Sequence, residues 1–173
     1  AAEDQVLTLD LSGLDALEGT WSVGNVDDKL IAAAAVEGDL IRFTPVAHAS
    51  GRAVVKITRT NRFAASSAQD VELTWTPVND SPGAPVAVRP GDDQKDVELA
   101  PVLEWKAEDI DSNALVYALF LGTDEDALSL LAAELHGTSQ TLERLSPQTR
   151  YFWRVVVQDE AGAQGEGTFS FVT

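Results

Sequence analysis

Acidic and amide side chains at alternate positions are the strongest candidate for chemistry in this sequence. Asp109, Asp111 and Asn113 are spaced two residues apart in a predicted loop, and Asp159 and Glu160 end a later predicted strand. Calcium binds about 6 to 8 oxygen ligands from carboxylates, amides, carbonyls and water. Carboxylates gathered at one loop tip repel one another unless a cation or solvent screens them. A calcium site and a solvated acidic loop both explain these residues.

The sequence gives little support for any other catalytic or metal-binding group of residues. The chain has no Cys, which excludes disulfides, thiolate metal sites and a cysteine nucleophile. Its two histidines, His48 and His136, are far apart in the sequence and supply too few ligands for zinc. No G-x-S-x-G motif marks a serine nucleophile. We therefore expect no catalytic residue, no required cofactor and two surface histidines.

The amino-acid composition argues against further classes of function. The 173 residues include 28 acidic and 12 basic ones, giving a formal net charge of -16, and they contain no Met. Such acidity argues against binding to nucleic acid, which needs clustered Lys and Arg. No apolar run reaches the roughly 18 residues that a membrane span needs. The absence of Met favours a segment of a longer chain or a processed product, and the flanking domains of a longer chain would be its partners.

Hydrophobic and polar residues alternate along most of the chain. The alternation is clearest over residues 7–11, 41–44, 53–58, 71–76, 103–107 and 151–157. This period of two predicts strands with one buried face, and the Gly- and Asp-rich turns between them favour β-sandwiches. All four Trp residues fall at inward positions and are predicted core residues, whereas Phe63 and Phe152 break the alternation.

Three segments depart from the simple alternation. Residues 77–85 hold three Pro and one Gly, which predicts a semi-rigid linker. Residues 115–121 are apolar on both faces, as in a central strand covered on both sides. Residues 124–135 are rich in helix formers after the N-cap candidate Asp124, which favours a three-turn helix. A single turn at 125–128 followed by a strand through Leu135 fits the same residues.

Basic residues gather on one predicted strand of the first half. Arg52 and Lys56 fall on its polar face. An acidic partner or a glycan carboxylate would suit them. A solvated strand face, or charged residues that guard an edge against pairing, would explain them equally well.

The second half resembles a known family. Residues 145–155 read Leu-Ser-Pro-Gln-Thr-Arg-Tyr-Phe-Trp-Arg-Val, which is similar to the L-x-P-x-T-x-Y-x-W-R-V stretch of bacterial fibronectin type III-like domains. Further matches are residues 101–105, 109–111, 115–117, 121–123 and 169–173, so that the resemblance covers about residues 84–173. It implies an all-β sandwich, a strand within 124–135, and a tyrosine corner in which the Tyr151 hydroxyl turns onto the upstream backbone. Trp105 and Trp153 would pack in its core.

The first half resembles bacterial cadherin-like or immunoglobulin-like tandem repeats. The matching residues are Glu3-Asp4 before the first strand, Phe43-Thr44-Pro45, and Pro77–Pro82. Many such repeats carry an Asp-x-Asp calcium motif after the first strand, but residues 11–16 lack it here. The resemblance therefore implies no calcium site inside this half.

The resemblance also places the acidic loops. In a fibronectin type III-like sandwich, residues 109–113 and 159–160 lie at the end where the preceding linker enters, so the linker would approach them. The candidate calcium ligands are Asn79, Asp80, Asp109, Asp111, Asn113 and Asp159. Ser112-Asn113 stands where the family commonly has Gly-Asp, which removes one charge. A calcium ion at this place would stiffen the hinge between two modules.

These observations predict an all-β chain of two tandem immunoglobulin-like/fibronectin type III-like β-sandwiches, over residues 1–80 and 81–173. The favoured function is a non-catalytic structural or adhesive module pair, a stalk or spacer of a larger bacterial secreted or cell-surface protein. The alternatives are a module that binds a glycan or protein, and an accessory region of a large extracellular hydrolase. A surface platform of two or more exposed aromatic residues would favour ligand binding. An extracellular, cell-surface or periplasmic location follows from the same reasoning.

Overall fold

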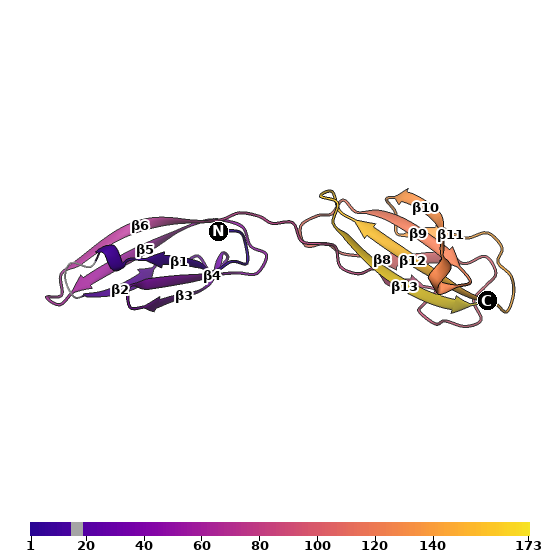
Figure 1. Cartoon of the computed structure of the whole chain (residues 1–173), viewed down its shortest axis with the longest axis horizontal. Helices are drawn as coiled ribbons and strands as arrows, with labels where there is room; N and C mark the ends of the chain where they lie inside the picture. The colour runs from indigo at the N-terminus through magenta and orange to yellow at the C-terminus, as the bar shows by residue number, and fades with distance from the viewer. Residues whose placement is uncertain (15–18) are drawn as a thin grey trace. The chain divides into compact units, whose positions relative to one another are not determined.

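The computed structural model describes residues 1–14 and 19–173 and divides the chain into two compact units, Ala1–Val78 and Asn79–Thr173 (Figure 1). The predicted boundary lay two residues later, between residues 80 and 81. Part of the region where the Asp-x-Asp motif was sought, Asp15 and Ala16, lies outside the described residues.

The first unit is a sandwich of two three-stranded antiparallel sheets. One has the order β1-β4-β3 and the other β2-β5-β6. Its elements are β1 (Leu7–Asp10), the short 3-10 helix η1 (Ser12–Leu14), β2 (Gly19–Gly24), β3 (Ile31–Glu37), β4 (Leu40–Pro45), β5 (Gly51–Asn61) and β6 (Ser66–Trp75). Alternate residues of β4 and β5, among them Phe43 and Val55, meet Trp75 in the core. The predicted period of two is thus the basis of this packing.

The second unit pairs a four-stranded sheet with a three-stranded one. Their orders are β10-β9-β12-β13 and β11-β8-β7. Its elements are β7 (Val86–Arg89), β8 (Val102–Lys106), β9 (Val116–Gly122), η2 (Glu125–Ala127), β10 (Ser129–Leu135), β11 (Ser139–Thr141), β12 (Arg150–Gln158) and β13 (Gln164–Val172). Trp105 of β8 and Trp153 of β12 are buried in the core between the sheets, as predicted. The two-sandwich, all-β architecture is therefore confirmed.

The ambiguous segment 124–135 takes the strand alternative. Asp124 caps one 3-10 turn, where its carboxylate accepts a hydrogen bond from the Asp126 N–H, and β10 follows. β10 pairs with β9, so tertiary pairing overrides the helix propensity of its Leu and Ala residues. The three-turn helix that propensity favoured does not form.

The expectation for residues 115–121 needs correction. β9 is indeed an inner strand of its sheet, but only Tyr117 and Leu119 are buried, while alternate residues on the other face are half-buried. That face is covered by side chains of its own sheet: the Arg154 guanidinium lies 5.0 Å from the centre of the Phe120 ring. Long side chains can shield a sheet in this way without a further layer.

The tyrosine corner is confirmed. The Tyr151 hydroxyl accepts a hydrogen bond of 3.1 Å from the Ser146 N–H, five residues upstream. Three of the four Trp residues are buried, and the fourth, Trp21, is half-buried at the side of the first core. The described helices are single turns, and none could cross a membrane.

Candidate functional site

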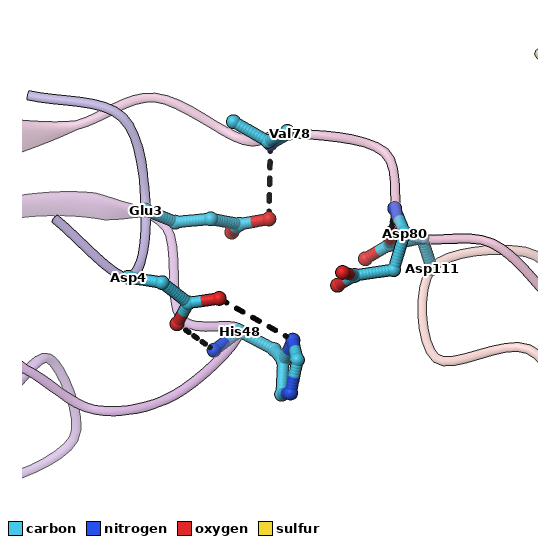
Figure 2. Close-up of polar contacts among 6 residues, drawn as sticks. All are labelled: Glu3, Asp4, His48, Val78, Asp80 and Asp111. Atoms are coloured by element: carbon cyan, nitrogen blue, oxygen red, sulfur yellow. Dashed lines mark hydrogen bonds and ion pairs between the residues drawn. The ribbon is translucent and has the colours of Figure 1, made fainter.

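Two residues of the predicted linker are hydrogen-bonded to loops of the second unit. The side-chain amide of Asn79 donates a hydrogen bond of 2.7 Å to Asp159 Oδ2, beyond the end of β12. The N–H of Asp80 donates one of 2.6 Å to Asp111 Oδ2, in the loop between β8 and β9 (Figure 2). Asn79 and Asp80 therefore lie close to the two acidic loops, as the resemblance implied.

Asp109 shapes the loop that carries Asp111. Its Oδ1 accepts the N–H groups of Asp111 and Ser112, at 2.7 and 2.9 Å, which closes a local turn. Its Oδ2 is buried and has no hydrogen-bond partner among the described residues. Asp109 thus positions Asp111 and keeps one carboxylate oxygen unused.

Asp159 holds the turn between β12 and β13. It is buried, and its Oδ1 accepts the Ala163 N–H at 2.8 Å while its Oδ2 accepts Asn79. The hydrogen bond from Asn79 lowers the pKa of Asp159, as do the backbone N–H groups of residues 161–163, and these outweigh the opposing effect of burial. Both oxygens already have protein donors, so this carboxylate fastens the linker to the loop.

The six predicted ligands therefore fall into three groups. Asn79 and Asp159 bond to each other, and Asp109 and Asn113 line a cavity of about 390 Å³ together with His136. Asp80 and Asp111 remain as a carboxylate pair whose oxygens lie within 4.8 Å. No third carboxylate or imidazole of this unit's described residues comes within that distance of both. The pair is the part of the predicted set best arranged to share a cation.

The first unit has a polar network at its own linker end. Glu3 is buried, and its carboxylate accepts the Val78 N–H at 2.9 Å (Figure 2). Asp4 accepts the His48 N–H at 2.8 Å, and its other oxygen lies 3.6 Å from the His48 ring. Sequence reasoning used Glu3-Asp4 as a family mark and missed these contacts. The signal was an acidic pair ahead of the first strand, but its partners are distant in sequence.

The basic residues of β5 have partners on the neighbouring strand. Arg52 lies 3.5 Å from Glu72, and Lys56 lies 3.6 Å from Asp70. These exposed ion pairs cross from β5 to β6, which fits the solvated strand face and leaves the acidic-partner alternative without support.

An apolar cavity in the first unit was not anticipated from the sequence. It has a volume of about 480 Å³ and is lined by Leu9, Leu11, Leu14, Trp21, Ile57, Arg59, Ser67, Ala68, Gln69 and Val71. The Arg59 guanidinium lies 5.7 Å from the Trp21 ring centre, so the two side chains cover part of its wall. Alternation alone does not show where the described residues of two facing sheets leave a hollow between them.

Comparisons with known proteins support the fold and go no further. No protein-family model matches the sequence, and neither does any curated protein. Among solved structures, the extracellular cadherin domains 3–6 of protocadherin gamma B2 align with a TM-score of 0.50 and 10% identity, over 89% of this chain and 39% of that one. The fibronectin(III)-like modules of Clostridium thermocellum CbhA align with a TM-score of 0.43 and 9% identity, over 99% and 87%. An amphioxus IgVJ-C2 molecule gives 0.45 and 7%, over 100% and 99%.

The likeness to the protocadherin domains agrees with the architecture described above. The chain is built of two all-β units, each with two packed sheets, which is the fold class that the resemblance implied. At such low identity the likeness concerns the fold, and a fold of this kind hosts many functions.

Proposed function

We propose that this chain is a non-catalytic structural module pair that acts as a spacer in a larger secreted or cell-surface protein. The observation that carries the proposal is the way in which the linker is held. A spacer must hold one module in a defined position relative to the next. This requires a linker with little conformational freedom.

Each half of the linker is fastened within its own unit. In the first unit, the Glu3 N–H donates to Thr76 O, and the Glu3 carboxylate accepts Val78 N–H. In the second, Asn79 and Asp80 bond to the acidic loops, and the Gly83 N–H donates to Glu108 O. Most residues of the predicted linker thus belong to one unit or the other, and the peptide bond between Val78 and Asn79 joins them.

The aromatic residues favour a spacer over a ligand-binding module. All aromatic residues of the chain are described, and Phe63 is the one that is mostly exposed. Its ring is approached by the Arg62 guanidinium at 4.8 Å. A single exposed ring offers no stacking platform for a glycan, and the acidic side chains at the loop end serve as turn and linker acceptors.

Distance measurements between the units test the spacer proposal. The chain has no Cys, so Thr44→Cys in the first unit and Thr141→Cys in the second, both exposed, would carry spin labels specifically. We expect a narrow distance distribution, and a broader one when two Gly residues are inserted between Val78 and Asn79. The same insertion after Gly137, in an exposed turn, serves as the control. A distribution that is already as broad without the insertion would refute the proposal.

We also propose that the Asp80–Asp111 pair binds calcium. Two carboxylates this close repel each other, and a divalent cation would offset that repulsion while Asp109 holds the loop in place. Carbonyl groups and water would complete the coordination.

Thermal unfolding tests the calcium proposal. We expect millimolar calcium to raise the melting temperature of the wild type, and Asp111→Asn to remove most of the rise. Asp126→Asn, which changes an exposed acid on another loop, should keep it. A wild type whose melting temperature does not respond to calcium would rule the site out and would leave the spacer proposal standing.

A further inference from the structure

The cavity of about 390 Å³ in the second unit has a polar lining. It is formed by the residues that follow β8, by the start of β9 and by the residue that follows β10. The polar residues that line it are Glu108, Asp109, Ser112, Asn113, Tyr117 and His136. Its volume lies at the lower end of the range of sites that hold small ligands. The size and the lining therefore suit a small polar molecule or a single polar side chain.

Tyr117 lines this cavity with a hydroxyl group that has no partner. Only 5% of its surface is exposed, and its ring packs edge-on against Trp105, with 5.6 Å between the ring centres. No described residue forms a hydrogen bond with its hydroxyl group. Buried tyrosine hydroxyls usually have a hydrogen-bond partner. A ligand in the cavity would supply one here.

Asp109 provides a second unused acceptor at the same cavity. Its Oδ1 accepts the N–H groups of Asp111 and Ser112, so the carboxylate is already held in position. Its Oδ2 is buried and has no hydrogen-bond partner among the described residues. A buried carboxylate oxygen without a donor costs free energy. A ligand that carries N–H groups would offset that cost.

The charge of the lining favours a cation. Glu108 and Asp109 contribute two carboxylates, and no Lys or Arg is among the described residues that line the cavity. A directly bound metal ion fits poorly, because ligands must converge on one point. None of the described Asp, Glu or His residues of this cavity belongs to a group of three whose ligand atoms lie within 4.8 Å of one another. An organic cation with several donors can instead reach acceptors that lie apart.

A guanidinium group meets these requirements better than an ammonium group does. It carries five N–H donors in one plane, whereas an ammonium group carries three at one point. It is also the more weakly hydrated of the two, so that its transfer into a cavity costs less free energy.

We propose that this cavity binds a guanidinium group, either that of an arginine side chain or that of a free guanidinium compound. The Asp109 carboxylate and the Tyr117 hydroxyl accept its N–H groups, and the exposed Glu108 adds a second negative charge. Neither the spacer proposal nor the calcium proposal uses this cavity, so this inference goes beyond both of them. Two acceptors and a small cavity support weak binding, with a Kd of the order of 1 mM.

A chemical-shift titration of the whole ¹⁵N-labelled chain tests the proposal with three matched probes. These are acetyl-arginine amide, acetyl-lysine amide and acetyl-citrulline amide, the last of which keeps the shape of arginine without its charge. We expect the arginine probe to give saturable shifts at the amides of Ser112, Asn113 and Tyr117. The lysine probe should bind about threefold or more weakly, and the citrulline probe about tenfold or more weakly. Equal binding of the three probes, or no saturable shift at these amides, would overturn the proposal.

Two substitutions test the acceptors. Asp109→Asn keeps an oxygen for the turn but replaces the second carboxylate oxygen by a donor, and should weaken binding of the arginine probe about tenfold or more. Tyr117→Phe removes only the hydroxyl and should weaken binding about threefold. Asp126→Asn, an exposed acid on another loop, is the control and should bind as wild type does. If Asp109→Asn fails to fold, Tyr117→Phe decides alone, and wild-type affinity in either folded variant would refute the assignment.

Two further arms identify the source of the ligand and separate this site from the calcium site. Acetyl-arginine amide resembles arginine within a protein, whereas agmatine is a free guanidinium compound without peptide groups. Tighter binding of the first would indicate a protein-borne arginine, and tighter binding of the second a small molecule; either result supports the proposal. Asp111→Asn, which should lose the response to calcium, should still bind the arginine probe within about twofold of wild type. Loss of both responses in this variant would contradict a separate guanidinium site.

Discussion

At the scale of single residues, the two ends of β12 are held by one hydroxyl and one carboxylate. Tyr151 at its start bonds to the Ser146 backbone, and Asp159 after its end binds Asn79 and the turn before β13. Each is a single side chain that ties a loop to a core strand. The free energy of these contacts can be measured because each can be removed with little change in shape.

Replacing Tyr151 by Phe should destabilise the second unit by about 0.5–1.5 kcal/mol, the net contribution of one hydrogen bond. The ring remains stacked on Phe171, 5.7 Å away between centres, so that only the hydroxyl is lost. Urea unfolding followed by tryptophan fluorescence would measure the change.

Tyr117→Phe provides the matched control for that substitution. Tyr117 is buried in the same core, but its hydroxyl forms no hydrogen bond within the described residues. We expect this change to leave the free energy of unfolding within about 0.5 kcal/mol of wild type. Equal effects at the two positions would contradict the tyrosine corner.

Asp159 should make the second unit sensitive to acid. Its hydrogen bonds lower its pKa in the folded state below the ordinary value of 3.8. A carboxylate whose pKa falls on folding stabilises the protein above the unfolded-state pKa, and this contribution is lost as pH falls through the folded-state value. We expect Asp159→Asn to be less stable than wild type at pH 7, and the difference to shrink below about pH 4. Urea unfolding at pH 7 and near pH 2.5 would show it.

Asp93 titrates in the same range and provides a check. The Arg150 guanidinium, at 2.7 Å, lowers the pKa of Asp93, so wild type and variant share that contribution and it cancels in their difference. Asp126→Asn should show no such pH-dependent difference. If the effect of Asp159→Asn were the same at both pH values, its ionised carboxylate would not be the stabilising species.

At the scale of secondary-structure elements, strand pairing determines the structure of a segment whose residues could form either a helix or a strand. The Leu- and Ala-rich segment after Asp124 has the residues of a helix, and it becomes β10 because β9 offers it an edge. The family resemblance found this strand, whereas the residues alone did not. Periodicity also identified the alternating strands correctly, because their pattern is produced by the cores into which they fold.

Gly165 lets the linker lie on β13. A side-chain carbon there would come within 2.6 Å of Pro82 O and 3.1 Å of Gly83 O, both backbone atoms that have little freedom to move. We expect Gly165→Ala to destabilise the second unit by about 1–3 kcal/mol, as overpacking does. The change should also raise amide exchange at Gly83, whose N–H donates to Glu108 O.

Gly137→Ala is the control for this close approach. Nothing lies within 4 Å of a side-chain carbon at Gly137, so this substitution should be nearly neutral. If Gly165→Ala were neutral as well, the linker would not be seated on β13 in solution.

At the scale of the whole molecule, the chain contains two hydrophobic cores and no disulfide bond. One core is built around Trp75 and Phe43, and the other around Trp105 and Trp153. The fold class and both cores could be predicted from the sequence because alternation and tryptophan placement are local patterns. The division of six acidic and amide residues into three groups could not, because it depends on how three separate segments meet to within an ångström.

The two units should fold independently when the chain is cut between Val78 and Asn79. The fragments 1–78 and 79–173 each keep a complete core, and each keeps its own linker contacts, from Val78 to Glu3 in one and from Asn79 to Asp159 in the other. We expect the near-ultraviolet circular dichroism of the two fragments to sum to that of the whole chain, and each to unfold cooperatively.

A cut after residue 85 is the comparison. It removes from the second unit the segment that lies on Gly165 and Gly167, and it also removes the Asn79–Asp159 hydrogen bond. We expect fragment 86–173 to be less stable than fragment 79–173. Equal stability would show that the linker residues are not part of the second fold.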